Sequence, residues 1–365
     1  PKEGEMLIQV LYLSVAPVMA MYMSGESIAQ RPPLAIGDMI HGRGVGRVLI
    51  SRRPGFEAGE VVHGQMGWQR YCVTSAPPAD RFYKYSATDL PAHLALGALG
   101  MTGFSAYCGF VDVGEPQPGK PVLVSGAAGG VGHTVVQIAR NLGCSPVVGI
   151  AGGPDKCAFL AELGCDAALD YRRDDLDAQI RAACPEGMDL YFDNVGGAVL
   201  EAALENLAFG ARIVLCGSIA EYKLDEPRGP ANYTRLRRHD ASMRGFYVYN
   251  HEADFAAAEL AMADWIRAGT LRPVQQITDG FEQLPPASVW TRPTGSPILA
   301  EVNQDNPIRG SGQCHGRRGC DDGFLSAAAD GPCVPDTARR GLCPGRIDRP
   351  RATGSRPTGG TTDQY

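Results

Sequence analysis

The pattern of hydrophobic and polar residues divides the chain into parts. Up to about residue 98, apolar and polar positions alternate in short runs such as residues 6–13 and 42–50, with glycine and proline between them. This alternation is typical of half-buried strands, so we expect residues 1–98 to form a β-rich domain. Residues 99–250 instead alternate wholly apolar runs with stretches of helical spacing, which predicts an α/β domain with a doubly wound parallel sheet.

Within the α/β part, residues 122–124 predict a buried strand, and a helix pattern follows over residues 131–142. Residues 251–303 are expected to return to the first domain, ending in a strand at residues 298–302. The other expected elements are strands at residues 146–151, 167–171, 187–192, 211–216 and 245–248, helices at residues 156–163 and 254–268, and a turn at Asp279–Gly280.

Residues 304–365 have a different composition. Arginine and glycine dominate, proline recurs, lysine is absent and no apolar period remains. Such a segment buries too little surface to offset its chain entropy, so we expect a disordered tail or an out-of-frame or read-through extension. Its potential metal ligands match no standard zinc spacing; they are Cys314, His315, Cys320, Cys333 and Cys343.

Composition sets outer limits on function. The 365 residues are 44% hydrophobic and 20% charged, with a net charge of −6, which gives no indication of nucleic-acid binding. The sequence contains no run of about 18 apolar residues and no basic-then-apolar leader, so a cytoplasmic protein is expected. Seven of the 11 cysteines stand singly among apolar or helical residues and are expected to be reduced, buried thiols: Cys72, Cys108, Cys144, Cys157, Cys165, Cys184 and Cys216.

The most informative segment is residues 122–132, VLVSGAAGGVG, in which a strand runs into a glycine turn and then a helix. Glycines leave no Cβ to keep a pyrophosphate away, and a helix N-terminus offers it unpaired N–H groups. The alternative is an ordinary tight turn between strand and helix. Because of the surrounding strand–helix–strand pattern, we predict a dinucleotide site that includes Ala127, Gly129, Gly130, Val131 and Gly132.

The end of the second strand bears on which dinucleotide binds. An NAD site usually has a carboxylate there, which would repel a 2′-phosphate, whereas this chain has Gly152–Gly153. Lys156 and Tyr171 follow at positions where a cation and a hydroxyl would converge on a phosphate. A solvated helix lysine and a half-buried aromatic are the alternatives for these two residues. Asp155 is as well explained by a helix N-cap role as by a ribose contact.

Four motifs in order resemble the medium-chain dehydrogenase/reductase family, in its zinc-independent prostaglandin reductase and 2-alkenal reductase branch, also known for leukotriene 12-hydroxydehydrogenase activity. They are residues 100–107 (GMTGFSAY), 122–132, 189–197 (DLYFDNVGG) and 216–222 (CGSIAEY). The resemblance extends from about Pro1 to Leu284. It implies a Rossmann domain plus a β-rich GroES-like catalytic domain, clipped before Pro1, and a homodimer that meets at the sheet edge near Val248.

Two segments depart from the family pattern. The family's early Ser-Val-Asp-Pro-Tyr-Met-Arg is replaced at residues 14–20 by SVAPVMA, which removes an acid and a base at Ala16 and Ala20. The family's glycine-rich stretch after Leu284, which reaches the cofactor, is replaced at residues 288–297 by SVWTRPTGSP.

The resemblance also implies a cofactor and its contacts. Similar proteins use Lys and Tyr at the positions of Lys156 and Tyr171 for the 2′-phosphate of NADP, so we predict NADPH. The further cofactor contacts that it implies, mostly at the nicotinamide end, are Met101, Thr102, Gly152, Asn194, Cys216, Gly217, Ser218, Ile219, Tyr222, Phe246, Tyr247 and Val248.

The expected chemistry follows from the ligands that are missing. Neither zinc set of the wider family is visible before the tail, so no metal residues are assigned. Without a Lewis acid, hydride transfer to the β-carbon of an enone or enal is the expected reaction. Tyr222, protonated at neutral pH, would donate a hydrogen bond to the enolate oxygen or hold the ribose hydroxyl that does so. The alternatives are an NADPH quinone oxidoreductase and a non-catalytic NADPH-binding protein.

Overall fold

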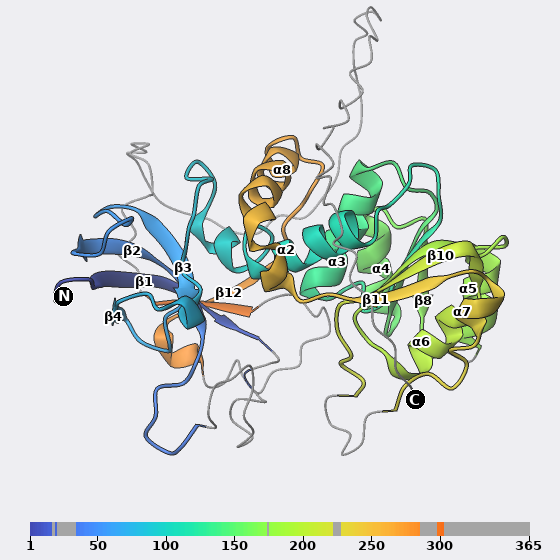
Figure 1. The fold of residues 1–365 in the computed structure, drawn as a ribbon, viewed down its shortest axis with the longest axis horizontal. Coiled ribbons are helices and arrows are strands. Elements are labelled where there is room, and N and C mark those ends of the chain that lie inside the picture. The colour runs from blue at the N-terminus through green and yellow to red at the C-terminus, as the bar shows by residue number, and fades with distance from the viewer. Residues whose placement is uncertain (17–18, 20–33, 174, 222–227, 285–297, 303–365) are drawn as a thin grey trace, which may run out of the picture. The chain divides into compact units, whose positions relative to one another are not determined.

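Two β-sheets organise the chain, as Figure 1 shows in a computed structural model. The structure describes residues 1–16, 19, 34–173, 175–221, 228–284 and 298–302, all within the unit formed by residues 1–310. The tail at residues 304–365, with its cysteines and His315, lies outside the described residues, as do Ala20, Tyr222 and residues 288–297.

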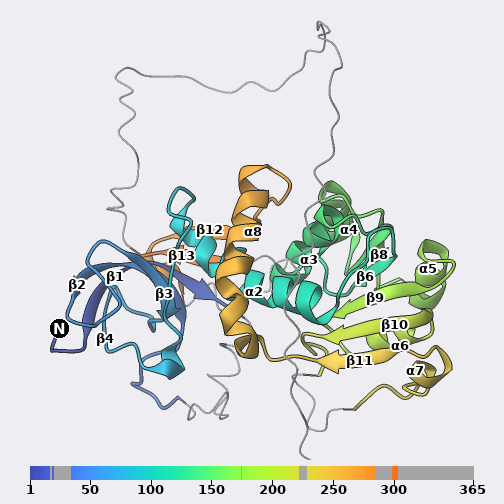
Figure 2. The same cartoon turned by 45° about the horizontal axis from the view of Figure 1, so that its top comes forward.

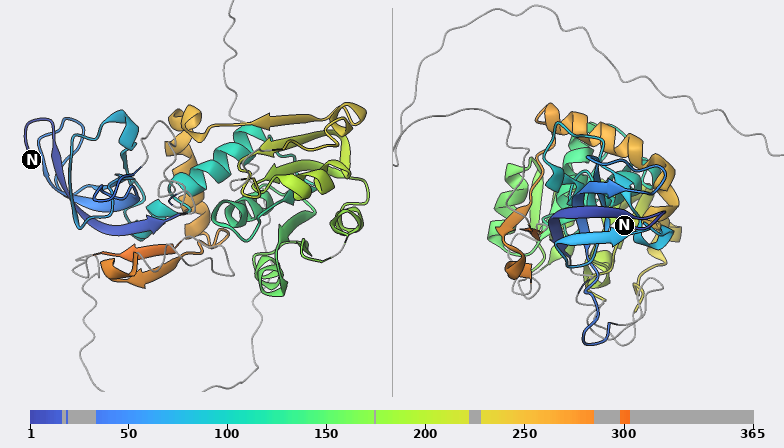
Figure 3. Two further views of the ribbon diagram at one scale, coloured as in Figure 1. Left: turned by 90° about the horizontal axis from the view of Figure 1, so that it is seen from below. Right: turned by 90° about the vertical axis from the view of Figure 1, so that its left-hand side faces the viewer.

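The first sheet has the order β12-β13-β1-β2-β3-β5, and β4 pairs with β1. In β1 the alternate residues Met6, Ile8 and Val10 are completely buried, as the sequence pattern predicts. β13 pairs antiparallel with β1, which confirms the predicted return strand, and β1 and β2 lie side by side in Figure 3. The strands are β1 (Met6–Val15), β2 (Arg43–Ser51), β3 (Val61–Gln65), β4 (Tyr71–Thr74), β5 (Tyr83–Lys84), β12 (Gln276–Asp279) and β13 (Ile298–Glu301).

The second sheet is parallel throughout and has the order β11-β10-β9-β6-β7-β8. If these six strands are numbered 1 to 6 in chain order and the sheet is read from β8 to β11, the order is 3-2-1-4-5-6, that of a Rossmann fold. The predicted doubly wound sheet is therefore confirmed. The strand order reverses between β6 and β9, where such folds bind ligands. The strands are β6 (Val122–Val124), β7 (Val147–Ala151), β8 (Ala167–Asp170), β9 (Met188–Asp193), β10 (Leu207–Leu215) and β11 (Ser242–Gly245).

Helices cover both faces of this parallel sheet (Figure 2). Because successive side chains of a strand point to opposite faces, Val122 and Val124 of β6 pack with α3, while Leu123 packs with α5 and α6. The helices are α2 (Met101–Tyr107), α3 (Gly130–Asn141), α4 (Pro154–Glu162), α5 (Leu176–Ala183), α6 (Gly197–Leu204), α7 (Arg235–Arg238) and α8 (Phe255–Arg267). Shorter helical segments are η1 (Pro78–Asp80), η2 (Ala92–Leu96), η3 (Cys108–Val113), η4 (Val248–Asp254) and η5 (Phe281–Gln283).

The predicted strand at residues 245–248 is wrong. Strand β11 ends at Gly245, and η4 begins at Val248. The neighbouring strand explains the difference, because β10 ends at Leu215, which pairs with Gly245. Among the described residues, no strand therefore lies beside residues 246–248 to continue the ladder.

The seven singly placed cysteines are all free; Cys157, Cys165 and Cys216 are partly exposed, and the other four are buried. Burial raises the pKa of the Cys216 thiol to about 12 and that of Cys72 to about 11, so these thiols are protonated near neutral pH. In the described part of the chain no helix has the length and apolar character needed to cross a membrane.

Helix α8 is attached to the loop after β5 by a buried carboxylate. Glu259 is 5% exposed, and its Oε1 accepts hydrogen bonds from the backbone N–H groups of Ser86 at 2.8 Å and Ala87 at 3.2 Å. Desolvation raises the pKa of Glu259. Arg267, the last residue of the helix, adds a bidentate ion pair with Asp89 at 2.8 and 2.9 Å.

We expect Glu259→Ala to lower the free energy of unfolding by about 1–3 kcal/mol, because it leaves two backbone donors without an acceptor. Glu259→Gln retains an acceptor and serves as the matched control. Because the folded pKa lies above the unfolded value, the wild type loses stability relative to Glu259→Gln as pH rises from the unfolded pKa through the folded one. Urea unfolding at several pH values measures both effects, and a wild-type advantage that grows with pH would contradict the assignment.

Candidate functional site

The glycine turn joins β6 to α3 with almost no free space. Gly126 has a φ of +55°, and Gly129 precedes α3 in an extended conformation without a capping side chain. A Cβ on Gly132 would lie 2.7 Å from Ala127 Cα and even closer to the carbonyl oxygen of Gly126. The turn thus requires glycine and leaves the first N–H groups of α3 without a capping side chain. This is the cradle that a pyrophosphate needs, so the residues present fit a dinucleotide.

His133, which the sequence analysis did not select, fixes the beginning of α3. Its backbone N–H and its Nδ1 both contact the carbonyl oxygen of Gly129, at 2.9 and 2.8 Å. Burial lowers the pKa of His133 to about 4, so the ring is neutral near pH 7 and Nδ1 is the donor. Its position four residues after Gly129, one helical turn on, is the signal in the sequence that would have identified it.

The end of β7 is covered by the residues that follow β8. A Cβ on Gly152 would lie 2.7 Å from the ring of Tyr171, so only glycine lets this ring approach. Asp170 Oδ1 accepts hydrogen bonds from the N–H groups of Gly153 at 2.9 Å and Arg172 at 3.0 Å. These bonds lower the pKa of Asp170 and join the two strand ends. The structure therefore places the ring of Tyr171 on Gly152.

Two cations stand at this end of the sheet. Lys156 is half-buried in the first turn of α4, and Arg172 Nη1 would lie 3.3 Å from a Cβ on Gly153. Neither forms an ion pair within the described residues. Arg172 is not among the residues predicted from the sequence, although it is the first of two arginines directly after the end of a predicted strand. Because no carboxylate ends β7, this region favours an anionic group.

At the switch point, the buried carboxylate of Asp193 joins β6 to β9. Its Oδ1 accepts hydrogen bonds from Ser125 Oγ and Tyr191 Oη, both at 2.7 Å, and from the backbone N–H groups of Val195 and Gly196 at 3.0 and 3.1 Å. All of these partners donate, so every contact uses the carboxylate as an acceptor. The side chain thereby fixes the start of the loop that follows β9.

Asn194 is held against the glycine turn. Its backbone N–H donates to Ser125 Oγ and its Nδ2 donates to the carbonyl oxygen of Ser125, both at 2.8 Å. A Cβ on Gly126 would lie 3.3 Å from Asn194 Cβ. Asn194 is half-buried, and the structure thus brings this predicted site residue beside the cradle.

The end of β10 reaches the same place through its backbone. The carbonyl oxygen of Asp193 accepts hydrogen bonds from the N–H groups of Cys216 at 2.8 Å and Gly217 at 3.1 Å. Ile219 and Ala220 then donate to the carbonyl oxygens of Asn194 and Val195. The predicted residues at 216–219, among them Ser218, therefore lie next to Asn194 as a second backbone segment.

The other predicted residues lie on helical segments. Met101 and Thr102, expected just before a helix, are the first two residues of α2 and are half-buried. The ring of Phe246 packs against Gly109 of η3, where Phe192 of β9 also lies. Tyr247 is 54% exposed, and Val248 begins η4. Their predicted contacts with a cofactor stay predictions.

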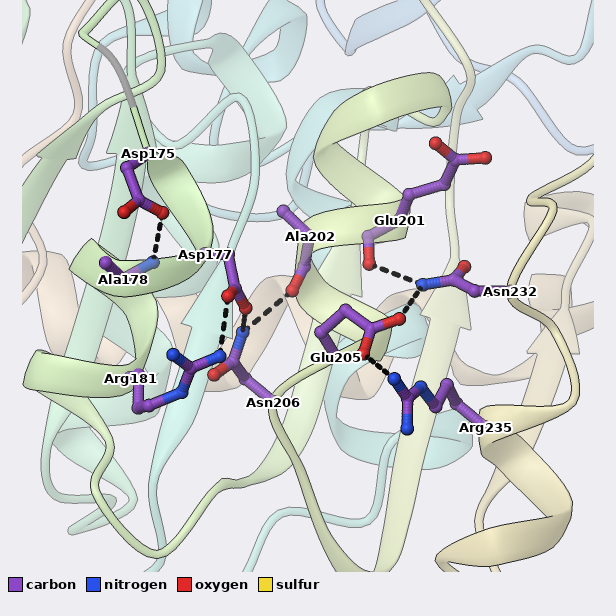
Figure 4. Close-up of polar contacts among 10 residues, drawn as sticks. All are labelled: Asp175, Asp177, Ala178, Arg181, Glu201, Ala202, Glu205, Asn206, Asn232 and Arg235. Carbon is purple, nitrogen blue, oxygen red and sulfur yellow. Dashed lines mark hydrogen bonds and ion pairs between the residues drawn. The ribbon is translucent and has the colours of Figure 1, made fainter.

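The chain after residue 227 is fastened to α6 by a polar cluster (Figure 4). Asn232 Nδ2 donates to Glu205 Oε1 at 2.7 Å and to the carbonyl oxygen of Glu201 at 2.9 Å, and Arg235 forms an ion pair with Glu205. These contacts lower the pKa of Glu205. The catalytic role predicted for Tyr222 falls outside the described residues and stays a prediction.

One group of possible metal ligands occurs within the described ranges. Atoms of Asp112, His251 and Asp254 lie within 4.8 Å of one another. His251 Nδ1 is 3.9 Å from Asp112 Oδ2, a contact that joins η3 to η4. The sequence analysis assigned no residue here to a metal.

Comparison with known proteins identifies relatives of both halves of the chain. Residues 130–264 match the family model of zinc-binding dehydrogenases, and residues 1–81 match the N-terminal domain of oxidoreductases. The chain is 39% identical to a putative NADP-dependent oxidoreductase of Bacillus subtilis, over 79% of this chain and 84% of the relative. It is 38% identical to the NADPH-dependent curcumin reductase of Escherichia coli, over 78% of this chain and 83% of the relative.

A solved structure agrees with these relatives. The crystal structure of CurA from Vibrio vulnificus in complex with NADPH is 33% identical, with a TM-score of 0.72, and covers 83% of this chain and 91% of that protein.

We expect Gly132→Ala to destabilise the protein by about 1–3 kcal/mol and to weaken dinucleotide binding, because the new methyl group meets backbone atoms that have no room to move. Gly229→Ala is the control, since a Cβ on Gly229 meets nothing within 4 Å. Thermal unfolding with and without the dinucleotide measures both effects. Unchanged binding by Gly132→Ala would contradict the cradle.

Proposed function

The chain belongs to the medium-chain dehydrogenase/reductase superfamily, in the branch of NADP-dependent reductases with prostaglandin, 2-alkenal and curcumin reductases, and we propose that it reduces the carbon–carbon double bond of α,β-unsaturated ketones or aldehydes with NADPH. The relatives include a 2-alkenal reductase of Nicotiana tabacum at 36% identity and prostaglandin reductase 1 of Bos taurus at 35%. Their names support conjugated carbonyl compounds as the substrate class.

The observation that supports the proposal most directly is the meeting of three strand ends beside the glycine cradle. Asp193 and Ser125 hold Asn194 and the residues after β10 at the switch point, where Rossmann folds bind the reacting end of a dinucleotide. NADPH, when bound, supplies the hydride for the β-carbon, and a proton from water at the α-carbon completes the reduction. We propose that Asn194 and the backbone of residues 216–219 orient the nicotinamide end.

The opposite end of the site supports NADPH over NADH. Gly152 and Gly153 put no carboxylate at the end of β7, and beside it stand Lys156 and Arg172, which form no close ion pair in the part of the chain that the structure describes. The nearby carboxylate of Asp170 is engaged by two backbone N–H groups, which reduces its repulsion of a phosphate. We propose that Lys156, Tyr171 and Arg172 bind the 2′-phosphate.

Two further parts of the proposal rest on the family. Tyr222 is proposed to donate its hydroxyl proton in a hydrogen bond to the developing enolate oxygen or to the ribose hydroxyl. We also propose a homodimer through β11. In the described residues β11 has a neighbour only on the β10 side, and Ser242, Arg244 and Gly245 are exposed, so a second copy has room to extend the sheet.

The purified protein is expected to oxidise NADPH when it is given 2-alkenals or enones, with products that are saturated at the double bond. Loss of reduced-nicotinamide absorbance and product mass spectrometry measure this reaction. A panel of quinones and simple aldehydes provides the controls. Turnover confined to quinones would favour a quinone oxidoreductase, and saturable NADPH fluorescence without any turnover would favour a binding protein.

Lys156→Ala is expected to weaken NADPH binding about tenfold or more while NADH binding changes by no more than about twofold, because only NADPH has the 2′-phosphate. Lys120→Ala is the matched control, since Lys120 is exposed just before β6, at the opposite end of the strands. Fluorescence titration with both nucleotides gives the affinities. Equal losses for NADPH and NADH would remove Lys156 from the phosphate site.

A further inference from the structure

Two buried hydroxyl groups donate to one carboxylate oxygen, and within the described residues only one of them also bonds to Asn194. Ser125 Oγ and Tyr191 Oη both lie 2.7 Å from Asp193 Oδ1, and both residues are completely buried. Ser125 Oγ also accepts the backbone N–H of Asn194 at 2.8 Å. The Tyr191 hydroxyl also contacts the side chain of Ser125, but within the described residues it makes no hydrogen bond to Asn194. Its ring packs with α5 and α6 on one face of the sheet.

The Ser125 hydroxyl therefore bridges Asp193 and Asn194, so that the position of the Asp193 carboxylate determines where the Asn194 backbone lies. It donates its proton to the carboxylate, which leaves its lone pairs directed at the Asn194 N–H. The backbone of Ser125 makes separate contacts, because its N–H donates to the carbonyl oxygen of Phe192 at 3.0 Å and its carbonyl accepts Asn194 Nδ2. Removal of the hydroxyl alone therefore deletes the hydrogen bond from the Asn194 backbone N–H. The hydrogen bonds of the Ser125 backbone stay in place.

The residue that carries this hydroxyl directly precedes the glycine turn in the chain. Ser125 is the first residue after β6, and Gly126 beside it lies against Asn194 and Val195. A change in the tilt of Asn194 thus acts on the end of the site where the nicotinamide is proposed to bind, and not on the 2′-phosphate end at Gly152.

We infer that Ser125 is a positioning residue, whose hydroxyl sets Asn194 for the nicotinamide end of NADPH; this rests on the proposed function. Tyr191, which shares the carboxylate but does not contact Asn194, has a structural role. The two residues form a matched pair, since Ser125→Ala and Tyr191→Phe each delete one buried hydroxyl that donates to the same atom.

The test compares both variants with the wild type in NADPH titrations, steady-state kinetics on an enone and thermal unfolding. Ser125→Ala is expected to raise the Kd for NADPH about tenfold and to lower kcat, while its Kd for 2′,5′-ADP, which lacks the nicotinamide half, stays within about twofold. Tyr191→Phe is expected to hold both Kd values within about twofold of the wild type despite a lower Tm. Equal NADPH losses in the two variants, or a wild-type Kd in Ser125→Ala, would overturn the inference.

A double-mutant cycle with Asn194→Ala keeps the proposal testable if one variant is poorly stable. Ser125→Ala is expected to add no further loss of NADPH affinity in the Asn194→Ala background, because the group that it positions is already gone. Additive losses would overturn the positioning role. A different result would contradict the proposed function: wild-type protein that binds NADPH but reduces no enone. In that case the NADPH affinities of the variants still decide the role of Ser125.

Discussion

The arrangement of the candidate site depends on the buried carboxylate of Asp193. Burial of such a group is costly unless donors surround it, and here two hydroxyls and two backbone N–H groups do so. The backbone carbonyl of the same residue accepts two N–H groups from the chain after β10. One residue therefore determines how the ends of β6, β9 and β10 meet. Those ends form the switch point, so the constraint that satisfies a buried charge also shapes the proposed nicotinamide end.

The two ends of the site use charge in opposite ways. Near Asp193, two hydroxyls and two backbone N–H groups donate to the protein's own carboxylate, and this fixes the position of the backbone and of Asn194 beside it. At the end of β7, Lys156 and Arg172 form no close ion pair within the described residues, and the carboxylate of Asp170, which attracts Arg172, is engaged by backbone donors. The first arrangement gives precise geometry, and the second gives an attraction for phosphate.

The sequence predicted what depends on local patterns. The strand at residues 122–124 and the helix after it were placed within one residue, because an apolar run and a glycine turn set their bounds. The strand expected at residues 245–248 was misplaced, since its extent depends on where β10 ends, and β12 was not foreseen. Ser125 and Arg172 escaped notice for a related reason. Their significance comes from Asn194 and Gly153, which lie 69 and 19 residues away in the chain.

Because of this difference in sequence distance, substitutions at the two ends of the candidate site are expected to affect stability differently. The proposed 2′-phosphate end is built from residues 151–172, two strands and one helix that are consecutive in the chain, and its two cations are the half-buried Lys156 and the exposed Arg172. Substitutions of these cations are expected to alter nucleotide preference at little cost in stability. The proposed nicotinamide end joins residues near 125, 194 and 216 through the completely buried side chains of Ser125 and Asp193, so a substitution of either is expected to affect binding and folding together. Nucleotide preference is therefore the property that can change with the fold intact, whereas the geometry at the switch point is bound to the stability of the sheet.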